Sequence, residues 1–254
     1  MIRITALPYL NCVPFVYGLK QSFITHQISL SLSTPDQTAH QLQNDLCDLA
    51  IVPVAAIPTL PRYQIIGNHC IGAISAVASV LLCSQVPIEQ IHEVALDQES
   101  RTSVLLVRLL LHNYWHVMPH YVPLPDSFPK NAPESVLLIG DKALLHSSLY
   151  PYVYDLAQHW IMWTGKPFVF AAWVTNKTLS EDFVLLFDQA LTYGVTHIDE
   201  AITSEVRYRF PKTMAKEYLT GNLSFSLDQE KLEGLHLFWK FCIDAINRVY
   251  TTMQ

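Results

Sequence analysis

Glycine and charged residues are scarce in this chain. Its 254 residues include only 8 glycines, and Asp, Glu, Lys and Arg together make up 15%. The glycine-rich loops that hold nucleotides, G-x-G-x-x-G and G-x-x-x-x-G-K-[S/T], are missing from the sequence, as is the G-x-S-x-G turn of serine hydrolases. Dinucleotide-binding, P-loop and serine-hydrolase functions therefore have no support.

Basic residues are also few. Lys and Arg number 16 against 22 Asp and Glu, a net charge of −6, and no run of five basic residues occurs. We therefore expect no nucleic-acid partner and no membrane partner. The longest apolar run, about 71–83, is too short to span a bilayer. Because the pattern at Ile2–Leu7 is that of a strand and not of a signal segment, we expect a cytoplasmic protein.

The residues that could bind a metal or form disulfides are poorly arranged for either purpose. The five cysteines are scattered, odd in number and without a C-x-x-C pair, so we expect buried thiols in a reducing compartment. His112, His116 and His120 have the spacing of one helix face, but Pro119 should end the helix before the third. No metal site is predicted.

Strand and helix patterns alternate along the first 174 residues, and helical patterns dominate from Leu179 onward. Half of the residues are hydrophobic, enough for a large core. This order predicts an α/β fold with mixed, mainly parallel sheets and a helical C-terminal region. We expect two lobes, residues 1–78 with 172–254 and residues 79–171, with more than one chain crossing between them. A ligand cleft is expected between the lobes, at the C-terminal ends of strands.

The segment Val94–Ser103 is the most informative single stretch. Val94–Leu96 has the pattern of a buried strand, and either Asp97 or Ser100 can cap a helix that runs from Ser100 to about Tyr114. The first turn of such a helix presents backbone N–H groups beside three hydroxyl groups, which suits a carboxylate or phosphate. An ordinary capped helix has the same pattern, so both interpretations stay open at this point.

Two other loops also follow predicted strands. Asn11 lies in the proline-flanked loop Pro8–Pro14, and Asp141 follows Gly140 at the end of the strand at 136–139, where it is expected to cap the next helix. Together with the Asp97–Ser103 turn, these loops are expected to face one cleft.

Six motifs in a fixed order resemble one known family, that of chorismate dehydratase. The motifs are Tyr9-Leu10-Asn11-x-x-Pro14, Asp48-Leu49-Ala50-Ile51-Val52-Pro53, Ser79-Val80-Leu81-Leu82, Val94-Ala95-Leu96-Asp97 with Ser100-Arg101-Thr102-Ser103, Leu138-Ile139-Gly140-Asp141-x-Ala143-Leu144, and Thr164-Gly165-x-Pro167-Phe168-Val169-Phe170-Ala171-x-Trp173. The resemblance covers nearly the whole chain. The chain departs from the family's pattern at two places. Residues 75–78 contain no glycine, and Lys166 stands where the family has a leucine.

The resemblance implies a two-lobed fold of the type 2 periplasmic-binding-protein kind, used in the cytoplasm as an enzyme. It implies removal of water from chorismate to give 3-[(1-carboxyvinyl)oxy]benzoate in the futalosine route to menaquinone. It also implies no metal and no organic cofactor.

The resemblance and the residues together suggest roles for the site. Ser100, Thr102, Ser103 and the helix N-terminus would hold a substrate carboxylate, and Ser79 would assist. Arg101 would offset the substrate's charge or pair with Asp97.

Asn11 and Ser100 are the predicted catalytic residues. Asn11 would orient the substrate or hydrogen-bond the departing hydroxyl, and Asp141 and Phe168 are further predicted substrate contacts. The family resemblance suggests that the enolpyruvyl carboxylate of the substrate serves as the base.

Two alternatives remain. The sister family, 1,4-dihydroxy-6-naphthoate synthase, shares the expected fold and pathway, and a non-catalytic protein that binds small organic anions could use the same fold. The sequence does not indicate whether the protein forms oligomers.

Overall fold

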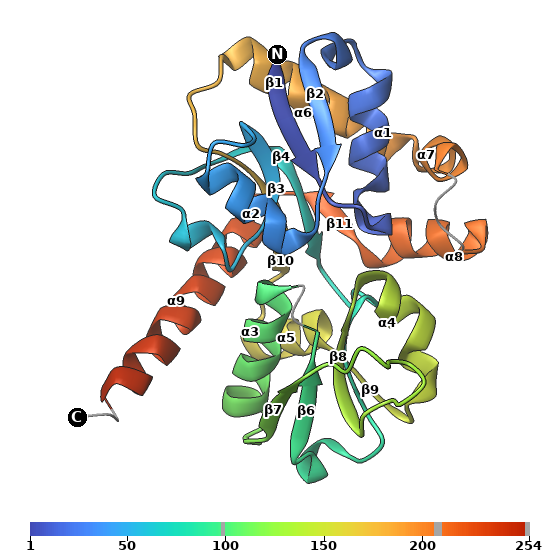
Figure 1. The fold of residues 1–254 in the computed structure, drawn as a ribbon, viewed down its shortest axis with the longest axis vertical. Helices are drawn as coiled ribbons and strands as arrows, with labels where there is room; N and C mark the ends of the chain where they lie inside the picture. Colours follow the sequence, from blue (N-terminus) through green and yellow to red (C-terminus); the bar gives the residue numbers. More distant parts are fainter. Residues whose placement is uncertain (98–99, 206–209, 252–254) are drawn as a thin grey trace. The chain divides into compact units, whose positions relative to one another are not determined.

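The computed structural model describes residues 1–97, 100–205 and 210–251 and divides the chain into two compact units (Figure 1). Unit 1 comprises Met1–Ala73 and Phe170–Leu227, and unit 2 comprises Ile74–Val169 and the chain from Asp228 onward. The chain thus passes between the units three times. The predicted lobes differ from the observed units mainly at the C-terminus, because residues from 228 onward belong with unit 2.

Unit 1 is built on a six-stranded sheet with the order β11-β4-β10-β3-β1-β2. Its strands are β1 (Ile2–Ala6), β2 (Ile28–Leu32), β3 (Leu49–Pro53), β4 (Gln64–Ala73), β10 (Phe168–Thr175) and β11 (Ser224–Ser226). β1 pairs in parallel with β2 and β3, whereas β10 pairs antiparallel with β3 and β11 antiparallel with β4. β3 and β10 are buried at every position, as expected of central strands with both faces covered.

The helices of unit 1 include one very close pair. They are α1 (Val13–Gln21), α2 (Pro35–Gln43), α6 (Glu181–Thr196), α7 (Ile198–Ser204) and α8 (Lys212–Glu217), with a π-helical turn at Tyr218–Asn222. α1 contacts α6 through Gly18 and Gly194, and a Cβ atom at Gly18 would lie 2.0 Å from the carbonyl oxygen of Ala190. Glycine is thus required where these two helix backbones meet.

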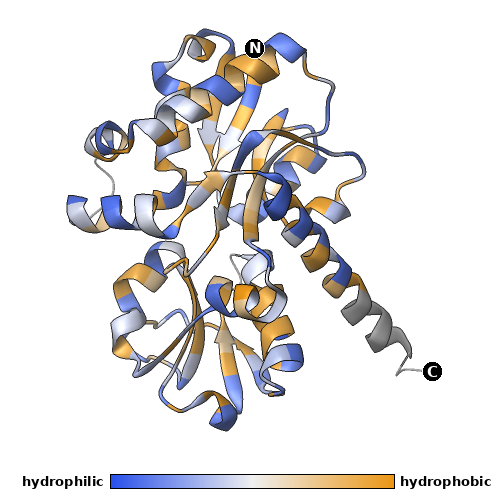
Figure 2. Ribbon diagram, turned by 180° about the vertical axis from the view of Figure 1, so that it is seen from behind, coloured by the Kyte–Doolittle hydropathy of each residue, from blue (hydrophilic) through white to orange (hydrophobic). Residues whose placement is uncertain are grey.

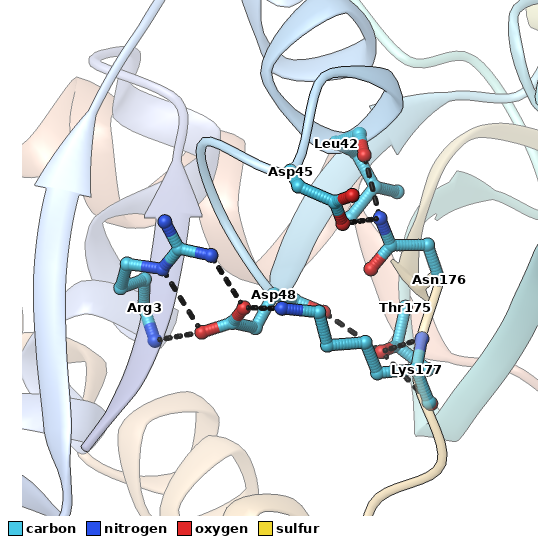
Figure 3. Close-up of polar contacts among 7 residues, drawn as sticks. All are labelled: Arg3, Leu42, Asp45, Asp48, Thr175, Asn176 and Lys177. Carbon is cyan, nitrogen blue, oxygen red and sulfur yellow. Dashed lines mark hydrogen bonds and ion pairs between the residues drawn. The ribbon is translucent and has the colours of Figure 1, made fainter.

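A buried carboxylate ties three segments of unit 1 together (Figure 3). Asp48, directly before β3, accepts hydrogen bonds from the backbone N–H (2.9 Å), Nε (3.1 Å) and Nη2 (2.7 Å) of Arg3 in β1. Lys177, two residues after the end of β10, donates to the same carboxylate at 2.5 Å, and Thr175 Oγ1 donates to the backbone carbonyl of Asp48. The sequence motif at Asp48–Pro53 therefore includes a structural residue.

Unit 2 contains a second mixed sheet, with five strands in the order β7-β6-β8-β5-β9. The strands are β5 (Val80–Ser84), β6 (Glu93–Leu96), β7 (His120–Pro123), β8 (Ser135–Ile139) and β9 (Tyr152–Asp155). β6 pairs in parallel with β7 and β8, whereas β5 pairs antiparallel with β8 and β9. Figure 2 shows hydrophobic residues along the strands, with hydrophilic residues on the outward faces of helices.

The helices of unit 2 are α3 (Arg101–Leu109), continued by a π-helical turn at Leu110–Tyr114, then α4 (Gly140–His146), α5 (Leu156–Thr164) and α9 (Gln229–Thr251). Short 3-10 helices occur in both units, at Leu10–Cys12, Phe23–His26, Ile57–Thr59, Ile88–Gln90 and Ser147–Leu149.

An aromatic cluster places the start of α9 in unit 2. Phe238 of α9 packs edge to face on Phe168, with ring centroids 5.1 Å apart, and on Trp160 of α5 at 6.0 Å. Gly234 lies against the backbone of Pro167, where a Cβ atom would come within 2.1 Å of the carbonyl oxygen. Burial of these large rings is the physical reason why the C-terminal helix does not belong with unit 1.

Most predicted elements are observed, and the differences are local. The helix from Ser100 to about Tyr114 is present as α3 and its π-helical turn, and the helical stretch from Glu181 is interrupted near Thr196 as predicted. The end of that stretch, 206–209, lies outside the described residues. Strands β9 and β11 were not predicted as strands, because β11 is only three residues long and two of the four β9 residues are exposed.

Candidate functional site

The candidate site in unit 2 forms along one edge of its sheet. The register pairs Val80 with Ile139 and Leu81 with Asp155, and β6 runs parallel to β8. The C-terminal ends of β6, β8 and β9 therefore share one edge with the start of β5. α4 and α5 begin directly at this edge, and α3 begins there after a short turn. The topology thus brings the Ser79, Asp97–Ser103 and Gly140–Asp141 segments together, as the sequence predicts for the ends of parallel strands.

Ser100 caps α3. Its Oγ accepts a hydrogen bond from the backbone N–H of Ser103 at 3.3 Å and lies 3.0 Å from the Ser103 hydroxyl oxygen. Of the two caps considered, Ser100 is therefore correct and Asp97 is not. The hydrogen bond between the Ser100 and Ser103 hydroxyls uses the hydrogen of only one of them. The hydrogen of the other hydroxyl can therefore be donated to an anion. Thr102 and Ser103 are buried in the first turn. Gln98 and Glu99, within the predicted turn, lie outside the described residues.

Asp97 and Lys142 form an ion pair that the sequence did not predict. Lys142 Nζ lies 2.8 Å from Asp97 Oδ2, and the side chain of Asp97 is only 3% exposed whereas that of Lys142 is 42% exposed. The ammonium stabilises a carboxylate that would be costly to bury alone. The Asp97–Lys142 pair joins the end of β6 to α4. Arg101, predicted to offset the substrate's charge or to pair with Asp97, is exposed in the first turn of α3. No local pattern in the sequence marks Lys142, because its partner Asp97 lies 45 residues earlier in the chain.

Ser79 and Asp141 lie on adjacent strand ends. Ser79 is buried in the turn directly before β5, and its carbonyl oxygen accepts a hydrogen bond from the backbone N–H of Gly140 at 2.7 Å. Asp141 is in the first turn of α4, where the helix dipole favours a negative charge. The predicted capping role of Asp141 is wrong, because Ile139 occupies the N-cap position and makes no side-chain capping bond.

Asn11 lies in unit 1, in the 3-10 helix Leu10–Cys12 between the end of β1 and the start of α1. Its Oδ1 is buried and has no hydrogen-bond partner within the part of the chain that the structure describes. An amide oxygen buried without a donor is costly, and Asn176 Oδ1 in the same unit is also unpaired. Asn11 thus offers an acceptor for a hydroxyl or N–H group.

Phe168 lies elsewhere in unit 2, in its aromatic core. Phe168 is 1% exposed, with its ring 5.3 Å from that of Trp160. Its ring also lies 5.1 Å from that of Phe238, so aromatic side chains surround it.

The three spaced histidines lie on different elements. His112 is in the π-helical turn, His116 is in a loop with a positive φ of 58°, and His120 begins β7. Within 1–97, 100–205 and 210–251, no group of three or more His, Cys, Asp or Glu is placed to bind a metal. No helix in the same ranges is both long and apolar enough to cross a membrane.

Comparison with solved structures identifies the class of the fold, that of periplasmic binding proteins. The chain is similar to the periplasmic aliphatic sulphonate binding protein SsuA of Escherichia coli (TM-score 0.62, 15% identity, covering 98% of this chain and 92% of that one). It is also similar to the Candida albicans CA3427 gene product, described as having the generic periplasmic binding protein fold (TM-score 0.57, 13% identity, 94% and 90% covered). Protein AF1704 from Archaeoglobus fulgidus has a TM-score of 0.76 at 14% identity, with 96% and 97% covered.

Within this class, the chain belongs to the menaquinone biosynthesis family, whose model matches residues 2–244. It is 26% identical to the chorismate dehydratase of Thermus thermophilus over 191 residues, which cover 67% of this chain and 70% of that protein. The family resemblance inferred from the sequence motifs is therefore confirmed.

Proposed function

We propose that the protein is a chorismate dehydratase, a hydro-lyase of the futalosine route to menaquinone. The observation that carries the proposal is the set of hydroxyl groups of Ser79, Ser100 and Ser103 at one sheet edge of a chain that belongs to the menaquinone biosynthesis family. The similarity to the Thermus thermophilus enzyme supports the same activity.

The substrate would bind unit 2 through a carboxylate. Chorismate is a dianion, and the first turn of α3 supplies the positive end of a helix dipole together with the hydroxyls of Ser100 and Ser103. Thr102 would add a further donor from the same turn, and Ser79 one from the start of β5, which is two strands away from β6 in the sheet. Arg101, Asp141 and Lys142 flank this turn, and the two cations would offset part of the substrate's charge.

The reaction removes the proton at ring C3 and the hydroxyl at C4, and the gain of aromaticity drives it. We propose that Asn11 acts on the reacting hydroxyl, because its buried Oδ1 has no hydrogen-bond partner among the described residues and can accept a hydrogen bond from that hydroxyl in the ground state. Its amide N–H can then donate to the departing oxygen. The C3 proton would pass to the substrate's own enolpyruvyl carboxylate, the C–H electron pair would form the new ring double bond as the C4–O bond breaks, and the departing hydroxide would take up that proton and leave as water. This requires the site to hold the substrate in a reactive conformation.

The decisive experiment is incubation of the purified protein with chorismate. The expected result is loss of chorismate and appearance of an aromatic product lighter by one water, followed by absorbance and mass spectrometry. Ser100→Ala and Asn11→Ala should each lower kcat/KM by roughly 10²–10³, the typical cost of one preorganised donor. The matched control is Ser180→Ala, which removes the equivalent cap of α6 in unit 1 and should leave the kinetic constants unchanged.

The alternatives give different results in the same assay. A 1,4-dihydroxy-6-naphthoate synthase should leave chorismate intact and convert a cyclic futalosine-type substrate. A binding protein should bind an organic acid, detectable by calorimetry, without any product. Turnover by Ser100→Ala or Asn11→Ala at the wild-type rate would remove that residue from the mechanism.

A further inference from the structure

Asp155 is a buried carboxylate at the same sheet edge that none of the proposed roles uses. It is the last residue of β9 and the N-cap of α5, and it is 8% exposed. Oδ1 accepts a hydrogen bond from the backbone N–H of Gln158 at 3.0 Å, the ordinary capping contact. Oδ2 faces the other way and accepts from the backbone N–H of Ala78 at 2.7 Å. One side chain therefore joins α5 to a turn 77 residues earlier in the chain.

The turn that Asp155 holds is the one that carries Ser79. Ala78 has a φ of 62°, in the left-handed region, which costs a residue with a Cβ atom roughly 1–2 kcal/mol. Such a conformation persists only when the surroundings hold it. Asp155 binds the turn at Ala78, and the N–H of Gly140 binds it one residue later, at the carbonyl of Ser79.

We propose that Asp155 is a positioning residue: by fixing the strained turn at Ala78, it holds Ser79 in place at the sheet edge where α3 also begins. The inference rests on the proposed function, because Ser79 is a site residue only if the substrate carboxylate binds at this edge. Asp155 thereby links the start of α5 to the turn that carries Ser79.

The geometry favours positioning over a role as the catalytic base. Both oxygens of Asp155 accept hydrogen bonds from main-chain N–H groups, and the N–H groups of Val77 and Ala157 also contribute. Burial raises the pKa of Asp155, and these N–H groups oppose that effect. A carboxylate whose oxygens are already bound to main-chain donors is poorly placed to take a proton from carbon.

The test separates the two hydrogen bonds of Asp155, the one from Gln158 and the one from Ala78. Asp155→Ser keeps an oxygen that can cap α5 at Gln158, but its side chain is too short to reach Ala78 as well. We expect a fall in kcat/KM of about 10- to 100-fold, as for a small misplacement of a binding group. Amide exchange at Val77 and Ala78 should become faster.

A double-mutant cycle with Ser79→Ala tests whether Asp155 acts through Ser79. If it does, the double variant should be about as slow as the slower single variant, because the two changes remove the same contribution. Multiplicative effects of the two substitutions would overturn the proposal, as would wild-type kinetics or unchanged amide exchange in Asp155→Ser. Failure of the wild-type protein to convert chorismate would instead refute the proposed function, and the positioning role with it.

Discussion

Replacing Asp48 by Asn should destabilise unit 1 in a pH-dependent way. The substitution keeps the size of the side chain and leaves an oxygen for the backbone N–H of Arg3, but it removes the charge that the Arg3 guanidinium and Lys177 share (Figure 3). The Asp48 carboxylate then no longer holds together three segments of the unit, which lie at the start of β1, before β3 and after β10.

The magnitude follows from how exposed each partner is. A hydrogen bond to a charged group contributes about 1.5–3 kcal/mol, whereas an exposed ion pair contributes about 0.2–1 kcal/mol. The Asp48 side chain is 11% exposed, but those of Arg3 and Lys177 are 45% and 44% exposed, so solvent weakens both pairs. We expect a loss of about 2 kcal/mol, or roughly 4–8 °C in Tm for a chain of this size.

The pH dependence gives the sharper test. The Arg3 guanidinium, opposed by burial and aided by Lys177, holds the pKa of Asp48 well below its usual value. A lowered pKa in the folded state means that the stabilisation is complete above the unfolded pKa of about 3.9, declines progressively below it, and is fully lost only when the pH passes the lowered folded-state pKa. Thermal unfolding of both proteins should therefore differ by a constant amount from pH 5 to 8 and converge below about pH 4.

The control is Asp199→Asn, which breaks an ion pair with Lys216 in which both side chains are more than half exposed. It should change stability by less than about 1 kcal/mol. Equal effects of the Asp48 and Asp199 substitutions at pH 7, or a Tm difference for Asp48→Asn that persists unchanged at pH 3, would refute the reasoning.

Two further predictions concern packing and thiol chemistry. Gly18→Ala should destabilise the protein by about 1–3 kcal/mol in urea unfolding, because the new methyl group would meet the Ala190 carbonyl, whereas Gly221→Ala, with nothing within 4 Å, should be nearly neutral. Burial raises the pKa of the Cys12 and Cys83 thiols to about 12, so at pH 8 a maleimide should label both far more slowly in the folded protein than in urea. Equal labelling rates in the two states would contradict their burial.

The candidate site was predictable where its signals are local. The cap at Ser100 and the hydroxyls of Thr102 and Ser103 lie within one helical turn, so the sequence shows them directly. Lys142 and Asp155 were missed because their partners are distant in sequence: Asp97 is 45 residues from Lys142, and Ala78 is 77 residues from Asp155. Phe168 stays a predicted substrate contact that depends on a motif alone, because a motif does not reveal which way a ring packs.

The sequence by itself determined the alternation of strands and helices, most helix starts and the family, because capping, periodicity and motif order depend on residues close together in the chain. Only the tertiary structure decided that α9 packs on the aromatic core of unit 2, and that Asp48 and Asp155 each join segments far apart in sequence. The physical reason is that strand order and side-chain packing are set by which buried surfaces fit together, and no local pattern encodes that choice.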